Sequence, residues 1–494
     1  MAGREQAIER KSDDKLPAGL EAELVGLVGR DYVLSSPVDL SVYECDGETL
    51  DIARPDLVVL PGSTQEVQAV IKLASQRGVP FAPRGAGTGL SGGATTVMGG
   101  ISLVLTRMTR IIEVDPGNRV AVVEVGATNA SVSLAAARHG LYFAPDPSSQ
   151  IASTIGGNLA ENSGGPHTLK YGITTQHVLG IKLVLPDGTV TSFGGKCRDA
   201  LGLDLLGIFV GSEGTLGVAT EATVRLTVRP EAVETMLAYF PSLELGGQAV
   251  SDIVAQGVIP AAMEMIDQIT LRAVEDALQL GLNRDAGALL IVELDGPRAG
   301  IAVHKQMVVD CVRSRGALEI RWAADAAERD SIWKARKSAF GALGRIAPHA
   351  YVLDGVIPRS RLAEAIRGIA AIGDKYQLLI SNIYHAGDGN LHPAILFHRE
   401  NHDEVVRTLK AGREILEMCV DLGGTLSGEH GIGVEKVLEM PVVFSAAELK
   451  AMDWVRDAFN PQGLCNPGKV LPTPKTCGES GSRPLLRHQL SAMC

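Results

Sequence analysis

The amino-acid sequence predicts an α+β protein with two main domains. Its 494 residues, of which 45% are hydrophobic and 21% charged, are enough for more than one core of ordinary size. Short apolar segments typical of strands alternate with amphipathic segments typical of helices. Glycine-rich loops crowd the first part of the chain and stop near residue 230. We therefore expect one α+β domain before that point and a second one after it.

The first domain is predicted over residues 56–230, after a helical N-terminal segment at residues 1–55. Residues 57–78 are typical of a strand, a turn and then a helix, which has apolar side chains at helical spacing and a glycine at its end. The same order of strand, glycine turn and helix recurs over residues 119–143. This repetition supports a regular α+β domain.

The second domain is predicted over residues 231–433. Amphipathic helices such as residues 267–279 alternate there with apolar strands such as residues 288–296. Residues 434–494 form a C-terminal segment, and its tail after residue 474 is expected to be loose.

Composition argues against several functions. A net charge of −11 disfavours binding to nucleic acid or anionic lipid. No segment approaches the roughly 20 apolar residues that cross a bilayer, and the charged N-terminus lacks the apolar core of a secretory signal, so a cytoplasmic protein is expected. The seven cysteines are scattered without a CxxC pair, so no iron–sulfur cluster is expected in this chain.

The segment HAGDGNLH, residues 385–392, predicts a metal site. Asp388-Gly389 is a strong signal for a two-residue hairpin turn. His385 and His392 lie at equal distances from that turn, so the hairpin would place them directly opposite each other, close enough to share one divalent cation. Alternatively, the glycines only make turns and the histidines bond to nearby backbone.

The segment SGEHGIG, residues 427–433, supplies a third ligand. Glu429 would complete a set with His385 and His392, and three protein ligands leave the vacant position of a catalytic metal. Two imidazoles and a carboxylate suit Zn, Mn or Fe, so the metal is not identified; Zn or Mn is favoured.

Three glycine-rich loops predict a nucleotide site. The first, residues 83–94, lacks both the P-loop ending and the Rossmann spacing, and alone it would be a plain connector. Residues 145–172 and 211–221 are similarly rich in glycine and small polar residues. Glycines let backbone N–H groups converge on phosphates, so together the three loops favour one groove for a long polyphosphate ligand.

These motifs resemble those of flavin-dependent oxidoreductases with the fold of vanillyl-alcohol oxidase. Together with HAGDGNLHP, SGEHGIG and the late NPGK at residues 466–469, they narrow the resemblance to the 2-hydroxy acid dehydrogenase branch. Residues 333–359 look most like the catalytic FAD subunits of bacterial glycolate oxidases. The resemblance implies a two-part FAD-binding domain to which the C-terminal segment returns, and an α+β substrate domain that caps the flavin.

The resemblance also implies the cofactor-binding residues. They are Pro83, Arg84, Gly85, Ala86, Gly87, Thr88, Gly89, Leu90, Ser91, Gly92, Pro145, Asp146, Pro147, Ser148, Ser149, Thr154, Gly156, Gly157, Asn158, Asn162, Ser163, Gly164, Gly165, Tyr171, Gly172, Glu213, Gly214, Gly217, Val218 and Asn466. Covalently flavinylated relatives have a histidine where this chain has Thr88, so non-covalent FAD is expected.

The expected reaction is oxidation of a small 2-hydroxy acid, glycolate to glyoxylate, by hydride transfer to flavin N5. His430 is the candidate base because imidazole titrates near neutral pH, and Arg336 is the candidate clamp for the substrate carboxylate. Without the resemblance, Arg336 would be interpreted as a solvated helix charge. Relatives that take dicarboxylates have a lysine where Val352 stands, which favours a small monocarboxylate; a D-lactate dehydrogenase is the alternative.

The resemblance further implies two partner subunits, one with iron–sulfur clusters and one of flavin fold, that pass electrons toward membrane quinone. Association with the inner face of the plasma membrane would then be indirect. Two other function classes stay open: a zinc hydrolase with Glu429 as base, in which the glycine loops only make turns, and an FAD-binding electron-transfer or scaffold subunit without a substrate site.

Overall fold

The computed structural model describes residues 16–197 and 202–472, so the predicted tail after residue 474 lies outside the described part. The chain divides into two compact units. The first contains the chain up to Ser163, Ile173–Val228 and the residues from Glu429 onward. The second contains Gly164–Gly172 and Arg229–Gly428. The sequence-based division at residues 55, 230 and 433 did not anticipate that Gly164–Gly172 groups with the second unit.

The first unit begins with a four-stranded sheet. Its order is β1-β2-β4-β3, in which β2, β4 and β3 are parallel. The strands are β1 (Val33–Leu34), β2 (Leu57–Val59), β4 (Ile101–Val104) and β3 (Phe81–Arg84). Helix α3 (Thr64–Arg77) is preceded by Ser63, whose hydroxyl caps the N–H of Glu66, and is followed by Gly78, which has a left-handed φ of 62°. The strand and helix predicted within residues 57–78 are therefore confirmed.

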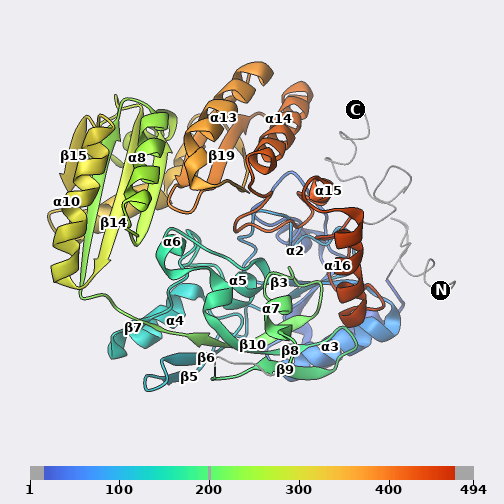
Figure 1. Ribbon diagram of the computed structural model, residues 1–494. Coiled ribbons are helices and arrows are strands. Elements are labelled where there is room, and N and C mark those ends of the chain that lie inside the picture. The colour runs from blue at the N-terminus through green and yellow to red at the C-terminus, as the bar shows by residue number, and fades with distance from the viewer. Residues whose placement is uncertain (1–15, 198–201, 473–494) are drawn as a thin grey trace. The chain divides into compact units, whose positions relative to one another are not determined.

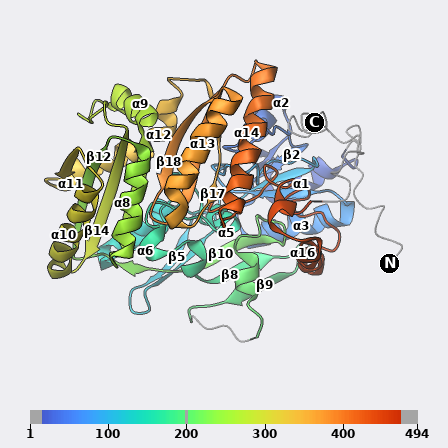
Figure 2. The same ribbon diagram turned by 45° about the horizontal axis from the view of Figure 1, so that its top comes forward.

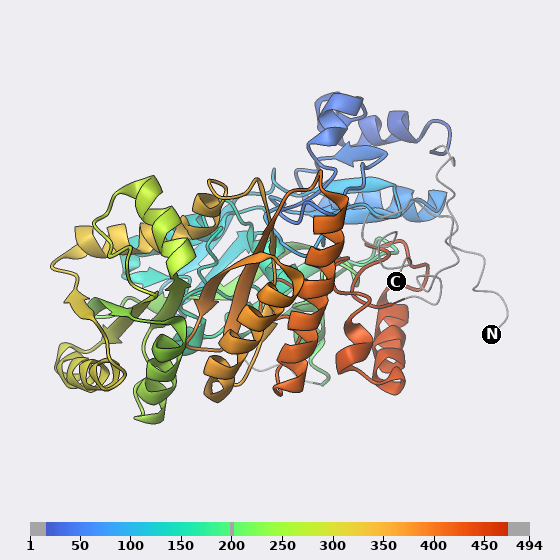
Figure 3. The ribbon, with the colours of Figure 1, turned by 90° about the horizontal axis from the view of Figure 1, so that it is seen from above.

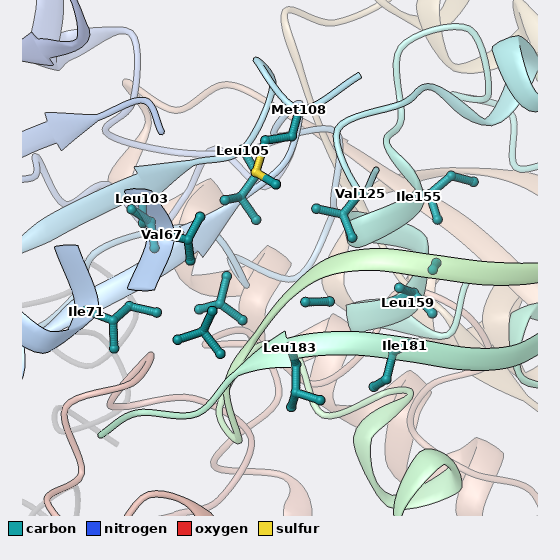
Figure 4. Close-up of a cluster of buried hydrophobic side chains, with 14 of the residues drawn as sticks. Val67, Ile71, Leu103, Leu105, Met108, Val125, Ile155, Leu159, Ile181 and Leu183 are labelled. Atoms are coloured by element: carbon teal, nitrogen blue, oxygen red, sulfur yellow. The ribbon is translucent and has the colours of Figure 1, made fainter. Parts of the chain in front are cut away.

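A second sheet of the first unit is antiparallel, with the order β5-β6-β10-β8-β9. Its strands are β5 (Ile111–Asp115), β6 (Val120–Glu124), β10 (Val218–Arg225), β8 (Val178–Val184) and β9 (Val190–Gly194). Side chains from α3, β4, β8 and the short helix α5 (Ile155–Glu161) meet in one core (Figure 4). This core fixes the sheet ends from which the glycine-rich loops emerge.

The first unit has several other described helices and strands. They are α1 (Leu20–Val28), α2 (Pro37–Ser41), α4 (Asn129–Ala136), β7 (Leu141–Tyr142), α7 (Leu205–Phe209), β11 (Thr227–Val228), α15 (Met440–Val443) and α16 (Ala446–Phe459), with 3-10 turns at Arg30–Tyr32, Ala137–His139 and Thr174–Gln176. The strand, turn and helix expected over residues 119–143 are present as β6 and α4.

The second unit is built on one antiparallel sheet of eight strands (Figure 1). Its order is β15-β12-β14-β13-β18-β19-β16, and β17 also pairs with β19. The strands are β12 (Ala232–Phe240), β13 (Ala262–Asp267), β14 (Ala288–Gly296), β15 (Glu319–Trp322), β16 (His349–Val352), β17 (Gly355–Val356), β18 (Leu379–His385) and β19 (Asn390–Phe397). The strand predicted at residues 288–296 is confirmed as β14.

Helices cover both faces of this sheet. On one face, α8, α10, α13 and α14 form a layer, and α13 and α14 run side by side (Figures 2 and 3). On the other face, α9, α11 and α12 pack on apolar side chains of β13, β18 and β19. The bounds are α8 (Leu243–Ala255), α9 (Gln268–Leu278), α10 (Arg298–Ser314), α11 (Ala326–Lys337), α12 (Ala339–Leu343), α13 (Leu362–Tyr376) and α14 (His402–Asp421), with α6 (Thr168–Tyr171) and a 3-10 turn at Arg359–Arg361.

One buried carboxylate joins three elements of the second unit. Asp267 ends β13 and caps α9 by accepting the N–H of Thr270 at 2.8 Å. Its other oxygen accepts the backbone N–H of Asn382 in β18 at 2.7 Å. Removing this side chain leaves the backbone N–H groups of Thr270 and Asn382 without their acceptor.

We expect Asp267→Ala to lower the free energy of unfolding by about 3 kcal/mol, a fall in Tm of roughly 6–12 °C for a unit of this size. Differential scanning calorimetry measures this. Asp276→Ala is the control, because Asp276 lies on the same helix but pairs with Arg284 at the solvent-exposed surface; its effect should stay within about 0.5 kcal/mol. Equal effects of the two substitutions would contradict the prediction.

Candidate functional site

In the first unit, the glycine-rich loops approach one another closely. A Cβ added at Gly85 in the first loop would lie 2.3 Å from Thr154 Oγ1, at the start of α5. A Cβ added at Gly214 in the third loop would lie 2.5 Å from Pro83 Cγ, and Gly214 also has a left-handed φ of 69°. The structure therefore brings the three predicted cofactor loops together, and a side chain at either glycine would collide with its neighbour.

The C-terminal segment joins the same loops. The amide Nδ2 of Asn466 donates to the carbonyl oxygens of Gly93 at 2.9 Å and Glu213 at 2.7 Å. Lys469 lies beside it and donates from Nζ to the oxygens of Gly93 and Asn466 at 3.3 and 3.1 Å. Burial lowers the pKa of Lys469 to about 8. The motif NPGK thus returns to the first unit, as the resemblance implied.

Several polar atoms in these loops are buried without a hydrogen-bond partner among the described residues. They include the amide nitrogen Nδ2 of Asn158, Nη1 of Arg84 and the hydroxyl of Ser91. Buried polar groups are rarely left unsatisfied in folded proteins, so such a cluster indicates a polar ligand. Converging glycines, a guanidinium and free donors fit the phosphates and ribityl chain of a dinucleotide. The residues therefore fit FAD.

The other predicted cofactor residues divide between the two units. Pro145, in the second loop, is held by Asn129, whose Nδ2 donates to the Pro145 oxygen at 2.8 Å. By contrast, Gly164, Gly165, Tyr171 and Gly172 belong to the second unit. There the hydroxyl of Tyr171 bonds to Asp295 of β14.

The predicted histidine hairpin exists, but its turn differs from the prediction. β18 and β19 are joined by four residues, Ala386–Gly389, and among them only Gly389 has a positive φ, of 83°. A two-residue type I′ turn would need two such residues. In the observed register His385 pairs with Asn390, and His392 pairs with Ile383. The prediction that the two histidines are directly opposed is therefore wrong.

The two histidines nevertheless lie close together. Residues two positions apart in a strand share one face, so His385 and His392 are diagonal neighbours on the same side of the hairpin. Their ring centroids are 5.0 Å apart and the rings are perpendicular. Both side chains are buried, on the sheet face that α11 and α12 cover.

A third buried side chain on this face was missed by the sequence prediction. Glu264 of β13 is the direct cross-strand partner of His385. Its Oε1 lies 2.7 Å from His385 Nδ1, and its Oε2 lies 2.5 Å from Nη2 of Arg336. Burial alone would raise the pKa of Glu264, but the charges of Arg336 and His385 hold it below its ordinary value. A signal existed: the glutamate stands in the middle of the apolar strand AAMEMID, where an isolated charge is costly.

Arg336 is not a solvated helix charge. It lies in the last turn of α11, and with Ile332 and Ala335 it forms the buried face of that helix. Its side chain is 1% exposed. Besides the ion pair with Glu264, the guanidinium has a buried Nε that makes no hydrogen bond with any described residue. Arg336 is thus a buried cation whose Nε is available to a ligand.

The two histidines of the second unit are suited to bind a divalent cation. His392 Nδ1 lies 3.1 Å from the carbonyl oxygen of Leu353, and His385 Nδ1 faces the Glu264 carboxylate. When each ring carries its proton on Nδ1, each presents Nε2 as a ligand atom. Metal-binding histidines in proteins are held in this way, by a carboxylate or carbonyl at the other ring nitrogen.

The stretch SGEHGIG is held at both ends. At one end, Asp354 accepts the Ser427 hydroxyl at 2.6 Å and the Gly428 N–H at 3.0 Å, all in the second unit. At the other end, in the first unit, the carboxylate of Glu213 accepts the N–H groups of Ile432 and Gly433 at 2.7 and 2.6 Å.

Glu429 and His430 follow directly after Gly428 and are grouped with the first unit. Their proposed roles as metal ligand and base stay predictions, as do the roles of the individual cofactor-binding residues.

Comparison with known proteins identifies the family. Residues 55–194 match the family described as FAD binding domain, and residues 229–470 match FAD linked oxidases, C-terminal domain. The chain is 45% identical to glycolate oxidase subunit GlcD of Escherichia coli K12 over 450 residues, 91% of this chain and 90% of the relative. The chain belongs to the FAD-linked oxidases. It is also 38% identical to GlcD of Bacillus subtilis 168, over 92% of this chain and 96% of the relative.

Further relatives agree with this membership. The D-lactate dehydrogenase of Archaeoglobus fulgidus is 34% identical over 84% of this chain and 91% of the relative. Two solved structures share the fold at low identity. The 4-ethylphenol oxidase of Gulosibacter chungangensis has a TM-score of 0.77 at 19% identity, covering 93% of this chain and 99% of that one. The p-cresol methylhydroxylase has 0.75 at 17%, covering 91% and 96%.

Several predictions are thereby confirmed. The protein is an FAD-linked oxidoreductase with the predicted α+β fold of the vanillyl-alcohol oxidase type, and its cofactor is FAD. The zinc hydrolase alternative is wrong, because the glycine loops at residues 83–94 and 145–172 lie in an FAD-binding domain. Among residues 16–197 and 202–472, no helix is long and apolar enough to cross a membrane.

We expect the FAD to be non-covalent, because Thr88 has no nucleophile that forms a stable bond to the isoalloxazine ring. Denaturing the yellow protein in acid or hot detergent and filtering it should release all the flavin into the filtrate, as measured by absorbance. Substituting Thr88→His offers a comparison, with the histidine at the position where flavinylated relatives carry theirs. Flavin that stays on the denatured wild-type chain would contradict the prediction.

Proposed function

We propose that this chain oxidises a small 2-hydroxy acid, with glycolate converted to glyoxylate, and that it passes the electrons to partner subunits. The observation that carries the proposal is an FAD-linked oxidase chain whose second unit holds a buried arginine and two histidines on one sheet face. Supporting it, two relatives of 45% and 38% identity, matched over at least 90% of their lengths, are glycolate oxidase subunits.

The reaction has simple requirements. The Cα hydrogen leaves with its electron pair, the hydroxyl loses a proton, and a 2-oxo acid forms. FAD supplies the acceptor of the electron pair and hydrogen. The protein must hold the carboxylate, take the proton and fix the Cα–H bond in one orientation.

Arg336 is proposed to bind the carboxylate. It is a buried cation whose Nε lacks a partner among the described residues, and a planar guanidinium holds a carboxylate in a defined orientation. His430 is proposed to take the hydroxyl proton, since imidazole accepts protons near neutral pH.

We further propose that His385, His392 and Glu429 hold one divalent metal, Zn or Mn. The Nδ1 contacts of both histidines support this, as does the position of Glu429 one peptide bond beyond the anchored Gly428. Such a metal supplies a Lewis acid for the substrate hydroxyl.

The substrate is proposed to be a monocarboxylate, because Val352 offers no second cation. D-lactate is the second candidate, supported by the relative named D-lactate dehydrogenase at 34% identity. The electrons are proposed to pass to an iron–sulfur subunit and a second flavin-fold subunit and then to quinone. The chain would act in the cytoplasm and reach the inner face of the plasma membrane only through these partners.

Anaerobic bleaching of the flavin tests the reaction. Glycolate, D-lactate, L-lactate and D-2-hydroxyglutarate are offered separately to the purified FAD-loaded chain, and the flavin absorbance is followed. We expect glycolate to bleach fastest, D-lactate more slowly, and L-lactate and D-2-hydroxyglutarate not at all. A yellow protein that L-lactate alone bleaches would overturn the proposal, and faster bleaching by D-lactate would favour the second candidate.

Substitution of a histidine tests the metal. We expect His392→Ala to remove the bound metal, measured by atomic emission, and to slow bleaching by roughly 100-fold while FAD content is unchanged. His398→Ala is the matched control, because His398 lies just beyond the same strand with its side chain 57% exposed. Equal metal content in His392→Ala and the wild type would contradict the proposed metal site.

A further inference from the structure

We propose that Glu264 is the positioning residue that couples the metal ligand His385 to the carboxylate-binding Arg336. The proposal rests on the function proposed above for these two residues. The buried Glu264 carboxylate orients both side chains, so that the metal and the substrate carboxylate are held at fixed positions relative to each other. Glu264 itself contacts neither.

Glu264 lies at a position where burying a carboxylate costs free energy. It lies in the middle of β13, where its neighbours along the strand, from Ala262 to Ile266, are all buried, and its own side chain is fully buried. Burying a charge costs several kcal/mol unless partners compensate it. The compensation here is specific: among the described residues the carboxylate forms an ion pair with Arg336 and a second polar contact with the ring of His385.

The two oxygens of Glu264 serve different partners. Oε1 faces His385 Nδ1 at 2.7 Å, and Oε2 faces Arg336 Nη2 at 2.5 Å. The first contact selects the tautomer of His385 that has its proton on Nδ1. Nε2, on the other side of the ring, is then the ligand atom. The second contact holds one edge of the guanidinium.

Backbone pairing makes this bridge rigid. Glu264 and His385 are direct partners in the ladder between β13 and β18, so their Cα positions are fixed by the sheet. Arg336 is the last buried position of α11, whose Ile332 and Ala335 pack in the apolar cluster on the same face. Because sheet and helix are both anchored, a change at Glu264 should reach both functional groups.

The simpler alternative is a structural ion pair that only fixes α11 to the sheet. A structural pair would change stability, and it would not change metal affinity separately from substrate affinity. The test therefore measures Zn²⁺ affinity without turnover, together with KM, kcat and Tm.

The test uses Glu264→Gln in the full FAD-loaded chain, stripped of metal by a chelator. Zn²⁺ is titrated in competition with a chromophoric chelator. We expect Zn²⁺ affinity to fall by about 10- to 100-fold, and KM for glycolate to rise by roughly 10-fold as Arg336 loses its fixed edge. FAD content should match the wild type. Glu293→Gln is the control for Zn²⁺ affinity, since Glu293 is a buried carboxylate on the neighbouring β14 that bonds to His167, Thr235 and Trp333 instead; it should bind Zn²⁺ as the wild type does.

A second substitution separates the two effects. In a His385→Ala background, Glu264→Gln should not weaken Zn²⁺ binding further, yet it should still raise KM. Glu264→Gln that keeps wild-type Zn²⁺ affinity and KM, and lowers only Tm, would overturn the proposal. If instead the wild type binds no Zn²⁺ and His385→Ala changes nothing, the proposed metal site itself fails, which is a distinguishable outcome.

Discussion

The second unit depends on one buried charged side chain, the carboxylate of Glu264. Glu264 sits in an apolar strand at a position where an uncompensated carboxylate would cost several kcal/mol, and the sheet and α11 bring His385 and Arg336 to it. The same contacts that offset its desolvation also fix a histidine tautomer and one edge of a guanidinium. Stability and the readiness of the proposed site therefore depend on one carboxylate, and neither can be altered there without affecting the other.

The first unit holds its glycine loops in one arrangement. It does so with polar side chains that bond to backbone. Asn466 bridges the carbonyls of Gly93 and Glu213, and the Glu213 carboxylate holds two N–H groups of the SGEHGIG stretch. Because these bonds leave donors such as Asn158 Nδ2 unused, the loops are organised and can still bind the cofactor.

Because the chain belongs to the FAD-linked oxidases and its proposed substrate is a 2-hydroxy acid, the tasks left to the protein are limited. The flavin accepts the electrons, so the protein contributes orientation, a cation for the carboxylate and a proton acceptor. Arg336 is suited to holding the substrate carboxylate, because its burial keeps water from competing for the substrate. The metal proposed on the paired histidines would assist loss of the hydroxyl proton and so lower the demand on the base.

The sequence by itself determined the order of the elements, the glycine loops and the histidine hairpin, because each depends on residues close together in the chain. The FAD cofactor followed from the resemblance of these motifs to those of a known family. Apolar spacing located α3 and β14 well, and turn glycines marked the loops. Tertiary structure decided the rest. The sequence placed the turn at Asp388-Gly389, but the register that offsets His385 from His392 is set by strand pairing, and residue types near a turn do not determine it. Glu264 reaches His385 across 121 residues, a contact that only sheet pairing creates. The sequence therefore predicted the histidine pair but not the carboxylate that lies beside it.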